Sequence, residues 1–221
     1  FDPTSPNLHL GHFLLLRKMR DFQDFGFITT FLIGDFTALI GDPTGRFSQR
    51  EKLTKIAVHN NCMLYKQQIE KFLDPKLTKI IFNSFWLTKL RIETLLKLCT
   101  FTTVAQMLHR EDFSKKYNSN VSIHLNEFLY PLLQGFDSVI MKADIEIGGI
   151  DQKFNLLVGR ELQRHFFQKE QILIMLPLLE GLDGIRKMSK SYNNYISLTD
   201  STKNIFGKIM SISDELMWLY Y

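Results

Sequence analysis

The sequence predicts an α/β fold, namely a Rossmann-like, doubly wound parallel sheet with helices on both faces. Short apolar runs that fit strands alternate with longer segments of helical periodicity. The strand-like runs are apolar throughout, which is typical of parallel strands buried on both faces. The chain has 221 residues, 45% of them hydrophobic, which is enough to form a full core.

Helical spacing and glycines define the elements of the first part of the chain. Leu15, Met19 and Phe22 keep the spacing of one helical face, and Gly26 is placed to end that helix. The expected elements are a helix over 11–25, a buried strand over 27–36, a glycine-rich loop over 37–45, a charged helix over about 49–73 and a short strand over 79–83.

The second part continues the alternation of helices and strands. The expected elements are helices over 92–108 and 126–141, a strand over 144–147, a helix over 151–166 and a strand over 172–178. Residues 181–194 combine glycines, lysines and serines without periodicity, so we expect the least regular structure there. The last residues, 216–221, follow a helical pattern.

Composition narrows the class of protein. The formal charge of +4, from 27 basic and 23 acidic residues, permits a polyanionic partner without demanding one. Cys62 and Cys99 form no CxxC pair, which favours reduced thiols and a cytoplasmic location. The longest apolar stretch, residues 172–179, contains a proline and is far shorter than the ~20 residues of a membrane helix, so we expect no membrane span.

A pair of histidines opens the first expected helix. In the segment TSPNLHLGH, His9 and His12 are three residues apart on either side of Gly11. The free N–H groups and dipole at a helix amino-terminus favour a phosphate chain, and a glycine leaves room for a flat ligand such as a purine. Incidental histidines or half of a zinc site are the alternatives, although metal sites normally need three or four ligands.

A basic segment near the end of the chain is a second candidate. The run KMSKS at 187–191 follows Gly181, Gly184 and Arg186, and its two lysines together with Arg186 place three cations within five residues. A solvated basic loop is the simplest interpretation. Mobile lysines that close over phosphates also stabilise the charge that develops in phosphoryl chemistry.

Polar side chains share one face of the expected helix 126–141. Tyr130, Gln134 and Asp137 are spaced i, i+4, i+7 in an otherwise apolar segment. A buried Asp137 can accept a hydrogen bond from a phenol, and Gln134 with Asp42 suits an ammonium group. The alternative is a polar network satisfied within the core.

The histidine segment and the lysine segment occur in the same order along the chain as a known pair of sequence motifs. FDPT at 1–4, HLGH at 9–12 and KMSKS at 187–191 resemble the signature motifs of class I aminoacyl-tRNA synthetases. Leu10 stands where the commonest family form has isoleucine, which is a volume-conserving change.

Four segments resemble the tyrosyl branch of that class, in its bacterial form. They are FDPT at 1–4, GDPTG at 41–45, YPLLQGFD at 130–137 and GGIDQ at 148–152. The resemblance implies an enzyme that activates tyrosine with ATP to tyrosyl-adenylate and transfers it to tRNA(Tyr). It also implies a homodimer, with the region 92–141 contributing to the contact through exposed apolar positions in 101–108.

The resemblance assigns roles residue by residue. The implied catalytic residues are His9, His12, Lys187 and Lys190; those at ATP are Asp2, Thr4, Gly11, Gly149, Asp151, Met188, Ser189 and Ser191; those at tyrosine are Asp42, Tyr130, Gln134, Asp137 and Gln152. The sequence offers no dedicated metal cage and implies no tightly bound cofactor, so Mg²⁺ is expected to accompany ATP and to be held by phosphates and water.

The implied organisation is that of a catalytic-domain fragment. Residues 1–180 would form the nucleotide-binding domain with a helical insertion at about 92–141, and residues 181–221 the KMSKS loop and the start of a helical region. Relatives carry a first strand before FDPT and a carboxyl-terminal anticodon-binding region, both expected to lie outside this chain. A tryptophanyl-tRNA synthetase and a catalytically idle RNA-binding paralogue are the alternatives.

Overall fold

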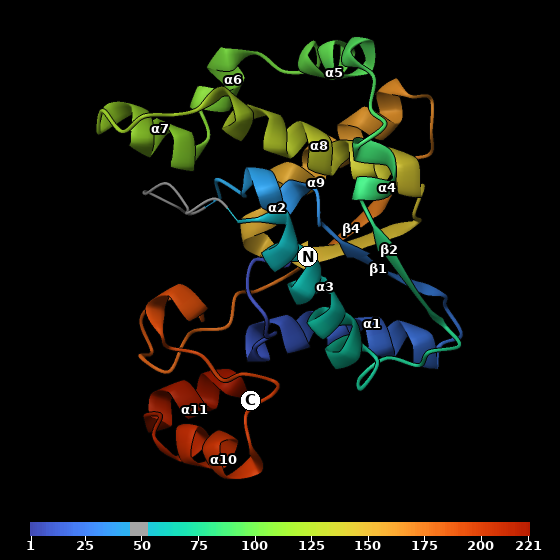
Figure 1. Cartoon of the computed structure of the whole chain (residues 1–221). Helices are drawn as coiled ribbons and strands as arrows, with labels where there is room; N and C mark the ends of the chain where they lie inside the picture. The colour runs from blue at the N-terminus through green and yellow to red at the C-terminus, as the bar shows by residue number, and fades with distance from the viewer. Residues whose placement is uncertain (45–52) are drawn as a thin grey trace.

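Parallel strands flanked by helices make up the computed structural model, which describes residues 1–44 and 53–221 (Figure 1). The helices are α1 (Leu10–Asp24), α2 (Thr37–Ile40), α3 (Lys55–Ile69), α4 (Ser84–Leu87), α5 (Ile92–Cys99), α6 (Val104–Leu108), α7 (Glu111–Asn118), α8 (Leu125–Met141), α9 (Lys153–His165), α10 (Thr202–Met210) and α11 (Asp214–Tyr220). The strands are β1 (Thr29–Ile33), β2 (Thr78–Phe82), β3 (Ile145–Gly149) and β4 (Ile172–Leu176), and two 3-10 turns are η1 (Ile150–Gln152) and η2 (Lys190–Tyr192).

The four strands form two parallel pairs. Strand β1 pairs with β2, with Thr29 opposite Thr78, and β3 pairs with β4, with Ile145 opposite Ile172. On β1, the backbone of Phe1 exchanges hydrogen bonds with the carbonyl of Leu32 and the N–H of Gly34. The predicted α/β class with parallel strands is therefore confirmed.

Helices pack on both sides of the strands. Figure 1 shows α8 and α9 on one side and α1 and α3 on the other. One apolar cluster joins α1, β1 and α3 through residues such as Leu16, Phe31 and Tyr65. A second cluster joins α8 and α9 through Phe136 and Leu162. The core is thus divided between the two faces, as a layered α/β fold requires.

The close contact of α8 with α9 depends on a glycine. A Cβ at Gly135 would lie 2.9 Å from side-chain atoms of both Val158 and Leu162, and 3.1 Å from the backbone nitrogen of Gly159. No larger residue fits there without displacement. This packing brings the polar residues on the facing sides of α8 and α9 within hydrogen-bond distance.

Several predicted boundaries differ from the structure. The strand expected over 27–36 is the shorter β1, and α2 lies inside the region expected to be a loop. The described part of the helix expected over 49–73 is α3, which begins after Thr54, whose hydroxyl accepts a hydrogen bond from the N–H of Ala57. The start of that expected helix, at 49–52, lies outside the described residues.

The single helix predicted over 92–108 was wrong. The chain instead forms α5 and α6, separated by a turn, because the hydroxyl of Thr103 caps the start of α6 and Gln106 bonds back to the N–H of Thr103. A β-branched residue with a hydroxyl offers the backbone this alternative to a continuous helix. Helices α4, α7 and α10 were not predicted.

The segment expected to be least regular is organised by one asparagine. Asn194 accepts a hydrogen bond from the backbone N–H of Ser189 and donates to the carboxylate of Asp183. A bridge between Glu180 and Lys187 and the 3-10 turn η2 add local structure. Residues 181–194 therefore form turns and one short 3-10 segment, without an α-helix.

Candidate active site

The two histidines lie together at the start of α1, with ring centroids 3.8 Å apart. The backbone N–H of His9 donates to Nδ1 of His12, so the proton of His12 resides on Nε2. Burial lowers the pKa of His9 to about 4 and the pKa of His12 well below its usual value, and Lys190 contributes to both shifts. Both imidazoles are therefore neutral near pH 7 and offer N–H donors rather than positive charges.

Gly11 allows the ring of His9 to lie against the helix start. A Cβ at this position would lie 3.1 Å from Cε1 and Nδ1 of His9. That Nδ1 atom is buried and has no hydrogen-bond partner among the described residues. A buried ring nitrogen without a partner is costly, which is consistent with a site that a ligand completes.

The KMSKS segment folds over the histidine pair. The ammonium group of Lys190 contacts the hydroxyl of Ser5, and that of Lys187 lies 3.1 Å from Oδ2 of Asp151. An isolated antiparallel bridge between His9 and Ser197 holds the two regions together. Segments from opposite ends of the chain thus meet at one place.

Asp137 is buried on α8, and its carboxylate is held by the segment that follows β2. Nδ2 of Asn83 donates to its Oδ2 at 3.0 Å, and Nε1 of Trp86 donates to its Oδ1 at 2.8 Å. Burial raises the pKa of Asp137 to about 7, against the effect of these two donors. The protein therefore fixes the orientation of the carboxyl, and the carboxyl changes its charge near neutral pH.

Tyr130, about two helical turns before Asp137, points to the amino-terminal segment. Its hydroxyl donates to Oδ2 of Asp2 at 2.9 Å, and the hydroxyl of Thr37 donates to Oδ1 of Asp2 at 2.7 Å. Burial raises the pKa of Asp2 to about 6. The structure thus links the polar face of α8 to the FDPT segment, a contact that helical spacing alone did not reveal.

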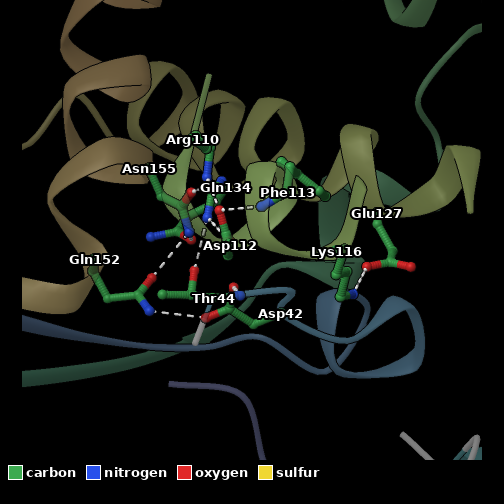
Figure 2. Close-up of polar contacts among 10 residues, drawn as sticks. All are labelled: Asp42, Thr44, Arg110, Asp112, Phe113, Lys116, Glu127, Gln134, Gln152 and Asn155. Carbon is green, nitrogen blue, oxygen red and sulfur yellow. Dashed lines mark hydrogen bonds and ion pairs between the residues drawn. The ribbon is translucent and has the colours of Figure 1, made fainter. Parts of the chain in front are cut away.

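The remaining predicted tyrosine-site residues form one polar network (Figure 2). Nε2 of Gln152 donates to Oδ2 of Asp42 at 2.8 Å. Nδ2 of Asn155 donates to Oε1 of Gln134 at 2.9 Å and to Oε1 of Gln152 at 3.0 Å. Asn155 therefore connects residues that come from separate elements.

A cavity of about 1150 Å³ is lined by the residues predicted for the site. It extends along β1 and β3 and along α1, and it includes the carboxyl ends of both strands, the position at which parallel-sheet proteins bind ligands. The predicted site residues that line it are Asp2, Thr4, His9, Gly11, His12, Asp42, Tyr130, Gln134, Asp137, Gly149, Asp151, Gln152, Lys187, Met188, Ser189, Lys190 and Ser191. Every residue predicted for the site therefore faces the same space.

Sequence reasoning missed three residues that orient this wall, of which Asn83 lines the cavity and Trp86 and Asn155 do not. Asn83 and Trp86 orient Asp137, and Asn155 orients Gln134 and Gln152. Asn83 ends the predicted strand 79–83, and strand ends are where site residues gather, so its position was a usable signal. Asn155 had only the weaker signal of a polar residue three positions after Gln152.

Two kinds of feature do not occur in the part of the chain that is described. Across residues 1–44 and 53–221, no three His, Cys, Asp or Glu side chains are arranged to hold a metal ion. Over the same ranges, no helix has both the length and the apolar character needed to cross a bilayer.

Comparison with known proteins identifies the class. Residues 1–221 match the family described as tRNA synthetases class I (W and Y). The chain is 58% identical over 221 residues to the tyrosine–tRNA ligase of Coxiella burnetii and 58% identical to that of Idiomarina loihiensis. All of this chain is covered in both comparisons, but it spans only 55% of each relative's length.

Solved structures share the fold. The tyrosyl-tRNA synthetase of Archaeoglobus fulgidus, solved with L-tyrosine, superimposes with a TM-score of 0.78 at 25% identity, over 96% of this chain and 63% of the other. The tryptophanyl-tRNA synthetase of Plasmodium falciparum gives a TM-score of 0.69 at 20% identity, over 95% of this chain and 57% of the other.

The Rossmann-like fold, with the histidine pair and the lysine segment meeting over one cavity, is that of a class I synthetase. The chain belongs to the family of class I tRNA synthetases for tryptophan and tyrosine. Among these, the relatives at 56–58% identity are tyrosine–tRNA ligases.

Proposed function

We propose that the full-length protein is a tyrosine–tRNA ligase, which joins tyrosine to ATP and then transfers tyrosine to tRNA(Tyr). One observation carries the proposal: the residues expected at ATP and those expected at tyrosine line a single cavity, so the two substrates can meet there. The identity to tyrosine–tRNA ligases over the whole chain supports the same conclusion.

The chemistry requires no nucleophile from the protein. A carboxylate oxygen of tyrosine attacks the α-phosphorus of ATP, the bond to the bridging oxygen breaks, and pyrophosphate leaves. A hydroxyl of the terminal tRNA ribose then attacks the tyrosyl carbonyl, and AMP leaves. The protein contributes by holding the reactants in line and by placing donors where charge develops.

The histidines and lysines supply those donors. His9 and His12 are neutral, so their N–H groups donate to phosphate oxygens without repelling Lys190. Lys187 and Lys190 bind the departing pyrophosphate. Lys187 is paired with Asp151 in the structure, so it exchanges this partner for phosphate when ATP is bound. The remaining residues at the adenylate are Asp2, Thr4, Gly11 and Gly149, with Met188, Ser189 and Ser191 closing over it.

Tyrosine binds against α8. Asp137, held by Asn83 and Trp86, accepts the hydrogen bond of the substrate hydroxyl. The residues around the ammonium end are Asp42, Tyr130, Gln134 and Gln152. Mg²⁺ enters with ATP and is held by phosphates and water, since the described residues provide no cage of carboxylates for it.

The wider organisation follows the same family. Residues 1–180 form the catalytic domain and 181–221 the KMSKS loop and the start of a helical region, in a cytoplasmic homodimer. Strongly exposed apolar residues support a contact through the region 92–141, namely Ile92, Leu96, Val104 and Leu125. The expectation of an exposed apolar stretch at 101–108 was mostly wrong, because Met107 is buried and Val104 is the one large apolar residue strongly exposed there.

ATP–pyrophosphate exchange with each of the twenty amino acids tests the proposal on the full-length protein. We expect exchange with tyrosine. Exchange that depends on tryptophan instead identifies the tryptophanyl alternative, and no exchange with any amino acid identifies an idle paralogue.

A further inference from the structure

Arg110 is a buried cation that lies behind the cavity and does not line it. Its side chain is only 7% exposed, and its guanidinium lies over the rings of Phe113 and Phe154, 5.1 and 4.5 Å from their centroids. Nε and one terminal nitrogen bind the two carboxylate oxygens of Asp112, at 2.9 and 2.6 Å. A cation held this firmly in the interior has a fixed orientation.

The other donors of Arg110 point toward the cavity wall. One terminal nitrogen donates to Oδ1 of Asn155 at 3.1 Å, and the other donates to the hydroxyl of Thr44 at 3.1 Å (Figure 2). Asn155 is 1% exposed, and it bonds in turn to Gln134 and Gln152. Arg110 is thus connected to two side chains of the tyrosine site through one intermediate residue, Asn155.

The direction of every hydrogen bond in this chain of residues is determined by its two ends. A guanidinium can only donate, so Asn155 must turn its oxygen to Arg110 and its nitrogen to the two glutamines. Both glutamines must then turn Oε1 toward Asn155. At the far end the carboxylate of Asp42 can only accept, which requires the nitrogen of Gln152, as observed.

This polarity matters at Gln134, which faces the cavity. Its Oε1 accepts one hydrogen bond from Asn155 and has a second lone pair available. If the amide turned by 180°, two NH₂ groups would face each other, and a donor would take the place of Oε1 beside Asn155.

We propose that Arg110 and Asn155 are positioning residues that set the amide orientation of Gln134 and Gln152, and so keep an acceptor in place for the ammonium group of the amino-acid substrate. The proposal rests on the proposed function, because it assumes that tyrosine occupies this cavity. Asp112 belongs to the same arrangement, since it fixes Arg110.

Asn155→Asp in the full-length enzyme reverses the polarity with almost no change in size. A carboxylate still accepts from Arg110, but it forces Gln134 and Gln152 to turn their nitrogens toward it. The matched control is Asn118→Asp, which adds the same charge at an exposed position on α7. A second variant, Arg110→Met with Asp112→Asn, removes the fixed donor without leaving a charge buried alone.

Calorimetric titration with two ligands separates positioning from general damage. L-tyrosine carries the ammonium group, and 3-(4-hydroxyphenyl)propionic acid lacks it but is otherwise the same. We expect Asn155→Asp and the double variant to weaken tyrosine binding by about tenfold, with binding of the deamino acid within about twofold of wild type. Asn118→Asp should match wild type for both ligands.

Three results would overturn the proposal. The first is unchanged or tighter tyrosine binding in Asn155→Asp, and the second is equal weakening of both ligands, which indicates a merely structural role. The third is a wild-type enzyme that binds the deamino acid as tightly as tyrosine, since the ammonium group then has no subsite to position. If the wild-type enzyme binds neither ligand, the proposed function itself is overturned. This result differs from the three above, in each of which the wild-type enzyme binds tyrosine.

Discussion

The indole Nε1 of Trp86 donates a hydrogen bond to Oδ1 of Asp137 at 2.8 Å. Asn83 binds the other carboxylate oxygen at 3.0 Å, so two donors from the segment after β2 fix a side chain of α8. This contact places an oriented acceptor in the cavity wall. Both its charge state and its partner in the substrate can be tested.

The raised pKa of Asp137 makes stability depend on pH. Burial raises this pKa from 3.8 to about 7, so between these values the folded state holds a proton that the unfolded state has lost. The resulting stabilisation is fully present below pH 3.8 and is lost as pH rises through 7. We expect wild type to lose about 2 to 3 kcal/mol more than Asp137→Asn in the free energy of unfolding between about pH 5 and pH 8, measured with urea. Equal losses in the two proteins would show that Asp137 is charged throughout.

Asp137 should also determine the preference for tyrosine over phenylalanine. Phenylalanine leaves the buried carboxyl with only the donors of Asn83 and Trp86, whereas the hydroxyl of tyrosine supplies a third. We expect Asp137→Ala to lower kcat/KM for tyrosine much more than for phenylalanine, narrowing their ratio by about tenfold or more in pyrophosphate exchange. Strong rejection of phenylalanine is already an established property of tyrosyl-tRNA synthetases, so the prediction concerns only the residue responsible for it. An unchanged ratio means that another group accepts the hydroxyl.

The lysines should act on rate rather than on affinity for tyrosine. We expect Lys190→Ala to slow adenylate formation by about 100-fold, and Lys187→Ala to slow it less, because Asp151 already offsets the charge of Lys187. Tyrosine binding should be nearly unchanged in both. Single-turnover kinetics with equilibrium titration measures the two quantities, and Lys203→Ala on the exposed face of α10 is the control. A loss of tyrosine affinity equal to the loss of rate contradicts this role.

Gly135 provides a test of the contact between α8 and α9. An added methyl group would lie 2.9 Å from Val158 and Leu162, so we expect Gly135→Ala to destabilise the protein by about 1 to 3 kcal/mol. Gly207 in α10 has no atom within 4 Å of an added Cβ, so Gly207→Ala should stabilise by up to about 1 kcal/mol through helix propensity. Urea unfolding of both variants checks the pair. Similar effects of the two substitutions would show that packing at Gly135 is not limiting.

Elements with a strong period or a strong motif were predictable from the sequence. The helix after His9, the apolar strands and the polar face of α8 belong to this group, because burial of one face imposes a fixed spacing. The motifs at 9–12 and 187–191 indicated the site. The break between α5 and α6 was not predictable from apolar spacing, because the hydroxyl of Thr103 decides it locally.

The supporting residues were hidden for a different reason. Arg110 contacts Thr44 and Asn155, which are far from it in the sequence, and its neighbours give no periodic signal of burial. A charged residue is ordinarily expected at the surface, so only the three-dimensional structure shows that this one is buried and paired. The side chains that line the cavity were therefore predictable, but the buried residues that orient those side chains were not.

Aminoacylation of tRNA(Tyr) by the full-length protein tests the central claim most directly. Labelled tyrosine or labelled tryptophan is incubated with the enzyme, ATP and Mg²⁺, and either tRNA(Tyr) or tRNA(Trp), and the charged tRNA is measured. We expect labelled tyrosyl-tRNA(Tyr) and only background with tRNA(Trp). Charging of tRNA(Trp) with tryptophan, or no charging of either tRNA by a folded enzyme, would contradict the account.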